Sequence, residues 1–70
     1  MNAEQWLAAY AEKLGIAAPT DEELEALLAL AGVAAHSSER KAAPLACWLA
    51  ARAGVEPDEA LRLAKQLTDA

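Results

Sequence analysis

Strand-forming residues are scarce in this chain, and this constrains its fold more than any other feature. No segment alternates polar and apolar residues with a period of two, the pattern of a half-buried strand. Leucine and alanine recur instead at the three- and four-residue spacing of amphipathic helices. The β-branched residues, which favour strands, are Ile16, Thr20, Val33, Val55 and Thr68. The sequence therefore predicts an all-α fold.

Glycine, proline and capping residues divide the chain into four helical segments. Asn2 is placed to cap the first, and Gly15 to end it in the left-handed conformation. The sequence TDEE at residues 20–23 is a capping box that opens the second. Gly54 ends the third segment, and Pro57 opens the fourth at the first helical position, which proline favours.

These segments predict a compact four-helix bundle, a single domain over residues 1–70. The helices are expected at residues 3–14, 21–35, 39–53 and 57–68. A start at residue 43 is the alternative for the third helix, because Pro44 fits a first helical turn but not a helix interior. The second helix carries the widest apolar stripe and is expected to be the most buried.

Length and charge limit the partners of such a chain. Seventy residues bury only about 60% of the surface of the unfolded chain, so a homodimer interface is a reasonable addition to the core. The net charge of −5 argues against nucleic acid, whose phosphates need lysine and arginine. There is no signal-peptide pattern, and no apolar run approaches the ~18 residues of a membrane span. We expect a cytoplasmic protein that binds neither nucleic acid nor a membrane.

The most polar segment is the junction between the second and third predicted helices. His36, Ser37, Ser38, Glu39 and Arg40 lie there between two alanine- and leucine-rich stretches. In a hydrogen-bonded corner, one serine would cap the incoming helix, and the basic side chains would donate to the last carbonyls of the outgoing helix. A solvent-facing recognition loop is the alternative. These five residues form the polar cluster, the candidate structural or interaction site.

Arg40 is the charged member of this cluster with the longest reach. Its neighbour Glu39 does not face it on a helix, because adjacent residues point in different directions. The expected partner is therefore a carboxylate elsewhere in the chain, such as Glu12 or Asp58.

The chain offers little catalytic or metal chemistry. His36 and Cys47 are its only soft ligands, whereas zinc sites use three or four protein ligands. No glycine-rich nucleophile elbow surrounds Ser37 or Ser38. Cys47 lies in PLACWLAA, where a small buried hydrophobe is the ordinary interpretation. We therefore expect no catalytic residue, no metal ion and no cofactor.

Trp6 and Trp48 are the candidate contact aromatics. Trp6 shares a helix face with Tyr10, and Trp48 shares one with Leu45 and Leu49. Core packing is the default for all of these side chains. An exposed tryptophan on a small acidic domain would instead indicate a contact with a partner protein.

A carrier or ligand-binding protein that acts through the His36–Ser38 region is an alternative function. In length, acidity and its four helical segments the chain resembles acyl carrier proteins. The Asp-Ser-Leu motif that bears the prosthetic group in those proteins is missing here.

A longer pattern covers nearly the whole chain. It comprises Trp6-Leu7, Pro19 with an acidic turn, His36-x-x-Glu39-Arg40-x-Ala42-Ala43-Pro44-Leu45, Gly54 and Pro57-x-Glu59-Ala60. In these residues the chain resembles a family of small bacterial helical domains of unknown function, which occur alone or fused to a molybdenum-cofactor guanylyltransferase. The resemblance implies an accessory role near molybdopterin-guanine dinucleotide biosynthesis. It implies no guanylyltransferase activity, because the nucleotide-binding α/β domain is missing.

These observations together favour a non-catalytic accessory or protein-interaction domain. Its expected partner is a protein, with a molybdenum-cofactor biosynthesis enzyme as the candidate that the resemblance suggests. The contacts are expected at Glu39 and Arg40 of the polar cluster and at an exposed part of Trp6 or Trp48.

Overall fold

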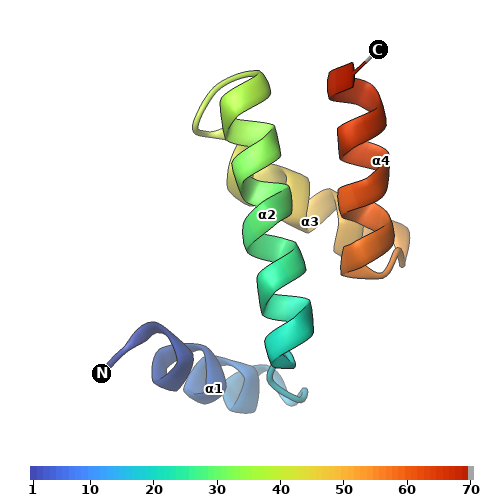
Figure 1. Ribbon diagram of the computed structural model, residues 1–70. Coiled ribbons are helices and arrows are strands. Elements are labelled where there is room, and N and C mark those ends of the chain that lie inside the picture. Colours follow the sequence, from blue (N-terminus) through green and yellow to red (C-terminus); the bar gives the residue numbers. More distant parts are fainter. Residues whose placement is uncertain (70) are drawn as a thin grey trace.

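A computed structural model describes residues 1–69 of the chain, and it is all-α over that range. Its helices are α1 (Ala3–Leu14), α2 (Asp21–Ser37), α3 (Ala42–Ala53) and α4 (Pro57–Asp69), as Figure 1 shows. No strand occurs among these residues. The predicted fold class and the number of helices are confirmed.

The helix boundaries follow the punctuation of the sequence closely. α1 has the predicted bounds, α2 continues two residues beyond the predicted end at residue 35, and α4 continues one residue beyond 68. A start of the third helix at residue 39 is wrong, because α3 begins at Ala42. That start lies one residue before the alternative and keeps Pro44 in the first turn, where its missing N–H costs nothing.

Reciprocal hydrogen bonds hold the first turns of α1 and α2. The backbone N–H of Gln5 donates to the Asn2 side chain at 2.8 Å, and the N–H of Asn2 donates back to Gln5 at 2.9 Å. Thr20 and Glu23 form the same box, with distances of 3.1 and 2.8 Å. Both predicted caps are therefore present, and each satisfies donors that a helix start leaves free.

α2 is the central helix of the molecule. Both α3 and α4 pack on α2, but they contact each other far less than either contacts α2. Figure 1 shows that α4 runs beside α2 in the same direction, whereas α3 crosses obliquely from the end of α2 toward the start of α4. The result is an open arrangement in which α2 forms the floor between α3 and α4.

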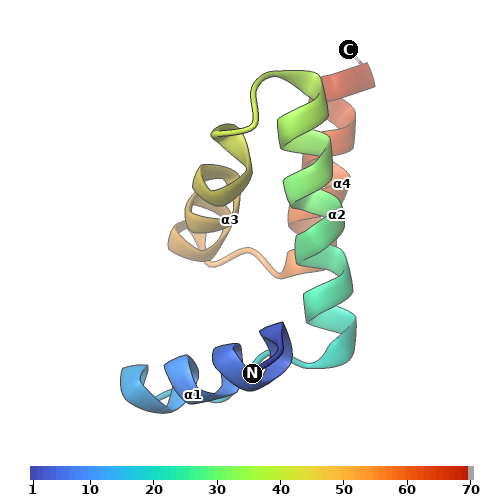
Figure 2. The ribbon, with the colours of Figure 1, turned by 90° about the vertical axis from the view of Figure 1, so that its left-hand side faces the viewer.

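α1 lies crosswise at the start of α2, as Figure 2 shows. In the described part of the chain, no Cα atom of α1 comes within 8 Å of a Cα atom in another helix. Its side chains Glu4 and Leu7 line a small hollow together with Pro19 and Leu24. α1 is thus joined to the molecule mainly at the end of α2, and most of its surface is free.

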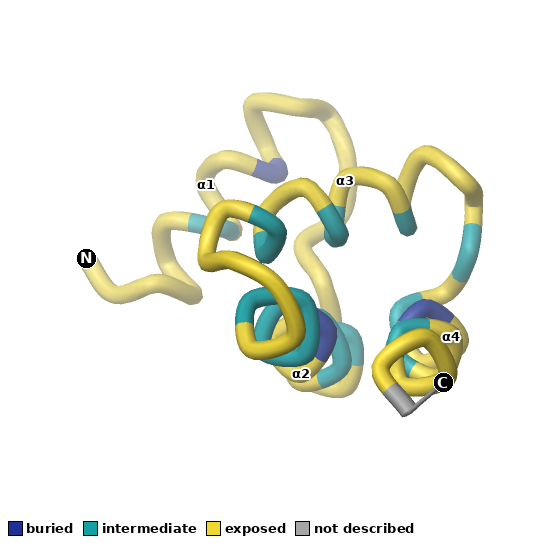
Figure 3. The backbone as a smooth tube through the Cα atoms, turned by 90° about the horizontal axis from the view of Figure 1, so that it is seen from above, coloured by how far each residue is buried: buried dark blue, intermediate teal, exposed yellow. Residues whose placement is uncertain are grey.

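The core is thin for a chain of this length. Only Ala11, Leu30 and Ala60 are buried among the described apolar residues, and none of these side chains is sealed completely from solvent. Figure 3 shows exposed residues along every helix. The larger apolar side chains that remain exposed are Met1, Trp6, Tyr10, Leu14, Ile16, Leu28, Leu45, Trp48, Leu49, Leu63 and Leu67.

No helix within residues 1–69 combines the length and the apolar character needed to cross a membrane.

Candidate functional site

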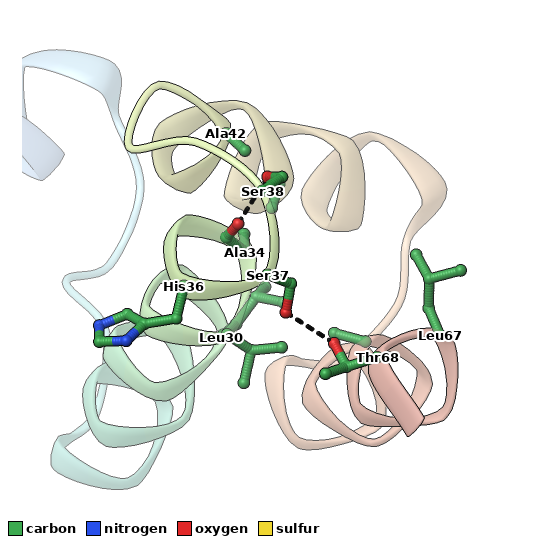
Figure 4. A pocket seen from close by; sticks show the side chains of 11 residues that line it. Leu30, Ala34, His36, Ser37, Ser38, Ala42, Leu67 and Thr68 are labelled. Carbon is green, nitrogen blue, oxygen red and sulfur yellow. Dashed lines mark hydrogen bonds between the residues drawn. The ribbon is translucent and has the colours of Figure 1, made fainter. Parts of the chain in front are cut away.

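The two serines of the polar cluster form hydrogen bonds with α2 and α4, and neither caps α3. The Ser38 hydroxyl donates to the carbonyl of Ala34 at 2.7 Å, which satisfies the last turn of α2. The Ser37 hydroxyl lies 2.9 Å from that of Thr68 and links α2 to α4, as Figure 4 shows. The prediction that a serine caps the incoming helix is wrong, because α2 extends to Ser37 and the cap position of α3 falls on Lys41.

The charged members of the cluster are exposed and weakly held. Glu39 pairs with Lys41 at 3.7 Å, and both side chains are largely in solvent. His36 is exposed in the last turn of α2, and Figure 4 shows its ring pointing away from Ser37 and Thr68. An exposed pair of this kind contributes little to stability.

The predicted pairing of Arg40 with a distant carboxylate is not formed. Within residues 1–69, no side-chain hydrogen bond or ion pair involves Arg40. Glu12 and Asp58 lie on α1 and at the start of α4, near the opposite end of α2 from Arg40 (Figure 1). Arg40 is exposed and free to meet a ligand.

A hollow of about 650 Å³ opens beside the cluster, between the end of α2, the start of α3 and the end of α4. Its walls are mostly apolar, with Leu30 and Val33 from α2 and Ala64 and Leu67 from α4. Figure 4 shows the Ser37–Thr68 hydroxyl pair at its edge. The volume is within the ~300–1,000 Å³ range of small-molecule sites.

A second hollow, of about 210 Å³, continues this space toward the other end of α3. The two share Leu30 and Ala46, and the second adds Leu49 from α3 and Leu63 from α4. We call these two adjoining hollows together the α3–α4 groove. The sequence analysis did not predict this groove. Leu63 and Leu67 on one side of α4 indicate an apolar face, but nothing in the sequence shows that α3 and α4 stay apart.

The candidate aromatics are not core residues. Trp6 and Tyr10 stack with ring centroids 5.0 Å apart, and each is about half exposed. Trp48 is 57% exposed on α3, where the Arg52 guanidinium lies 5.4 Å from the centre of a Trp48 ring. Core packing, the default expectation, is therefore wrong for both tryptophans. Within residues 1–69, no other helix has a Cα atom within 8 Å of a Cα atom of α1. α3 turns its alanines toward the groove.

Cys47 behaves as a small packing residue. Its thiol is partly buried and lies 3.9 Å from the carbonyl oxygen of Leu27, toward which it donates a weak hydrogen bond. Desolvation raises the pKa of the Cys47 thiol, which favours the protonated form and makes it a poor nucleophile. No three His, Cys, Asp or Glu side chains gather around a metal-sized space within residues 1–69.

On α4, the Glu59 carboxylate accepts hydrogen bonds from the Arg62 guanidinium, one of them at 3.0 Å. These bonds lower the pKa of Glu59, although the pair is exposed. Both side chains are largely exposed on α4, so the pair links two neighbouring turns of the helix surface and belongs to no candidate site.

An open all-α fold, a groove and exposed aromatic faces define a small helical domain with unfilled apolar surfaces. The family model described as a domain of unknown function, DUF6457, matches residues 1–70. The chain belongs to this family. No curated protein and no solved structure matches it.

Proposed function

We propose that this chain is a non-catalytic protein-interaction domain of the cytoplasm that docks on a partner protein through the outer face of α3. The observation that supports this most is the exposure of Leu45 and Trp48 beside Arg52. An apolar surface of this kind is costly to leave in water unless something covers it. Tryptophan and arginine are also the residue types that dominate binding energy at protein interfaces.

The geometry of Trp48 and Arg52 favours recognition. The guanidinium lies over the indole, so the stacking holds both side chains in a defined orientation before a partner arrives. Less side-chain entropy is then lost on binding, which is the general advantage of preorganisation. Leu45 extends the same helix face by one turn.

We propose an enzyme of molybdopterin-guanine dinucleotide biosynthesis as the partner, with the molybdenum-cofactor guanylyltransferase as the first candidate. The support is the resemblance of the chain to domains that occur fused to that enzyme. A domain that is fused to an enzyme in some chains often meets the same enzyme as a separate protein in others. The role is accessory, and the chemistry belongs to the partner.

Calorimetric titration of this chain into purified guanylyltransferase from the same organism tests the proposal. We expect saturable binding, and we expect Trp48→Ala to weaken it about tenfold or more. Leu28→Ala is the matched control, because Leu28 is equally exposed but lies on α2. Absence of binding would refute the partner, and binding that Trp48→Ala leaves unchanged would refute the α3 surface.

The hollow at Ser37 and Ser38 favours a second candidate, a carrier or ligand-binding protein that acts through the His36–Ser38 region. The intact mass of the natively purified chain tests the carrier form. A mass equal to that of the unmodified sequence would exclude it, whereas an added prosthetic group on either serine would favour it over the interaction domain.

A further inference from the structure

The folded chain exposes more surface than its size requires. Its solvent-accessible surface is 5522 Å², whereas a compact monomer of 7.3 kDa exposes about 4,200 Å². The excess of about 1,300 Å² exceeds the ~800 Å² that each partner contributes to a stable interface. The chain could therefore bury enough surface for a stable interface without any rearrangement of its core.

Part of the exposed apolar surface lies in the α3–α4 groove. Leu30 forms the floor, alanines of α3 form one wall, and Leu63 and Leu67 of α4 form the other. Alanines along a wall allow another backbone to approach closely, while the leucines supply apolar side chains to contact it. A channel of this shape between two helices accepts the apolar stripe of a third helix.

α1 has the properties of that third helix. It contains 12 residues, which corresponds to about 18 Å, the same length as α3. Trp6, Tyr10 and Leu14 recur along it at helical spacing and are each about half exposed. Within residues 1–69, no Cα atom of another helix comes within 8 Å of a Cα atom of α1, and the stripe stays about half open to solvent.

Between two copies, the charges favour contact of α1 with α3 over contact of one α1 with the other. Residues 1–25 hold six acids and one base, whereas residues 40–53, which include α3, hold three bases and no acid. α1 itself holds two acids and one base, and α3 holds Arg52 and no acid, so an α1 placed against the α3 of another copy meets a helix of opposite net charge. Packing the two acidic ends together would instead cost repulsion.

We propose that two copies of this chain form a symmetric dimer in which α1 of each copy lies in the α3–α4 groove of the other. The exchange is isologous and closes on itself, so it yields a dimer rather than a fibre. Trp6 and Tyr10 fill the groove along Leu49 and Leu63. This inference goes beyond the proposed function, because it concerns self-association and uses α1 and the α4 wall of the groove, neither of which belongs to the Trp48 surface.

The mass of the full chain in solution is the first test. Light scattering at tens of micromolar is expected to give twice 7.3 kDa, and a mass of 7.3 kDa would overturn the proposal. That second outcome includes the case in which α1 fills the groove of its own chain. Higher salt is expected to weaken the dimer, since the charge complementarity is screened.

Substitutions on the two proposed surfaces make the test specific. We expect Tyr10→Glu on α1 and Leu63→Glu in the groove each to raise the dimer dissociation constant about tenfold or more, with helical content checked by circular dichroism. Leu28→Glu, on an exposed leucine outside both surfaces, and Trp48→Ala are expected to leave it unchanged. A dimer that resists both surface substitutions would overturn the proposed arrangement.

Cross-linking answers the question even where a charged variant fails to fold. In a Cys47→Ala background, one chain carries Tyr10→Cys and a second, of different mass, carries Leu49→Cys. Mild oxidation of the mixture is expected to link the two different chains faster than a mixture in which Leu28→Cys replaces Leu49→Cys. Equal rates would overturn the proposal, whereas failure of partner binding alone would leave the dimer result intact.

Discussion

At the scale of single residues, the position of a helix end decided what each polar side chain does. Ser37 and Ser38 are neighbours, yet one bridges to α4 and the other closes the last turn of α2. The sequence favours a structural corner between the second and third helices, but only Ser38 acts there, on the last turn of α2, whereas Ser37 reaches α4. The sequence does not show which helix they serve, because that depends on α2 continuing to Ser37.

Arg40→Ala is expected to change the free energy of unfolding by no more than about 0.5 kcal/mol. The Arg40 side chain is exposed and forms no ion pair within residues 1–69, so its removal breaks no buried interaction. Urea unfolding followed by circular dichroism measures this. A loss of about 3 kcal/mol would reveal a buried charge pair instead and would make the polar cluster a structural corner.

Cys47 is expected to react more slowly with a thiol reagent in the native chain than in the chain unfolded by urea. Its raised pKa leaves less thiolate near pH 8, and its partial burial limits access. The difference due to pKa should shrink as the pH rises and the native thiol ionises. Stopped-flow alkylation at several pH values provides the rates, and equal rates in both states at pH 8 would contradict the packing role.

At the scale of the helices, local chemistry was sufficient. The capping boxes at Asn2 and Thr20 and the left-handed glycines Gly15 and Gly54 were predicted from the sequence, and each is present. Caps can be predicted from the sequence because the residues that interact are at most five positions apart. The start of α3 was less clear, since Lys41 makes no side-chain cap there and Pro44 alone limits it.

Two glycine substitutions should move stability in opposite directions. Gly54→Ala is expected to cost about 1 kcal/mol, because Gly54 ends α3 at a φ of 73°, where a Cβ is strained. Gly32→Ala is expected to add about 0.5 kcal/mol, because Gly32 lies inside α2 and its added Cβ meets nothing within 4 Å. Thermal unfolding of the two variants side by side gives both signs, and a stabilising Gly54→Ala would refute the cap.

At the scale of the whole molecule, stability depends on very few buried side chains. Leu30→Ala is expected to cost about 3 kcal/mol, because Leu30 is only 4% exposed and forms the floor between α3 and α4. Leu28→Ala, on the same helix but 65% exposed, should cost about 0.5 kcal/mol or less.

Urea midpoints at one protein concentration compare these two variants with the original chain, since self-association would make stability concentration-dependent. Equal midpoints for Leu30→Ala and Leu28→Ala would mean that α2 is not the centre of the fold.

The sequence by itself determined the all-α class, the four helices and most of their ends, because these depend on spacing, caps and breakers within a few residues. It also indicated which side chains are apolar and share a face. Only the tertiary structure decided which of those faces remain uncovered: the sequence left Trp6 and Trp48 open between core packing and an exposed contact, and both lie outside. Burial depends on where one helix lies relative to the others. The periodicity of an apolar stripe is the same whether the stripe packs against its own chain or stays open for a second chain.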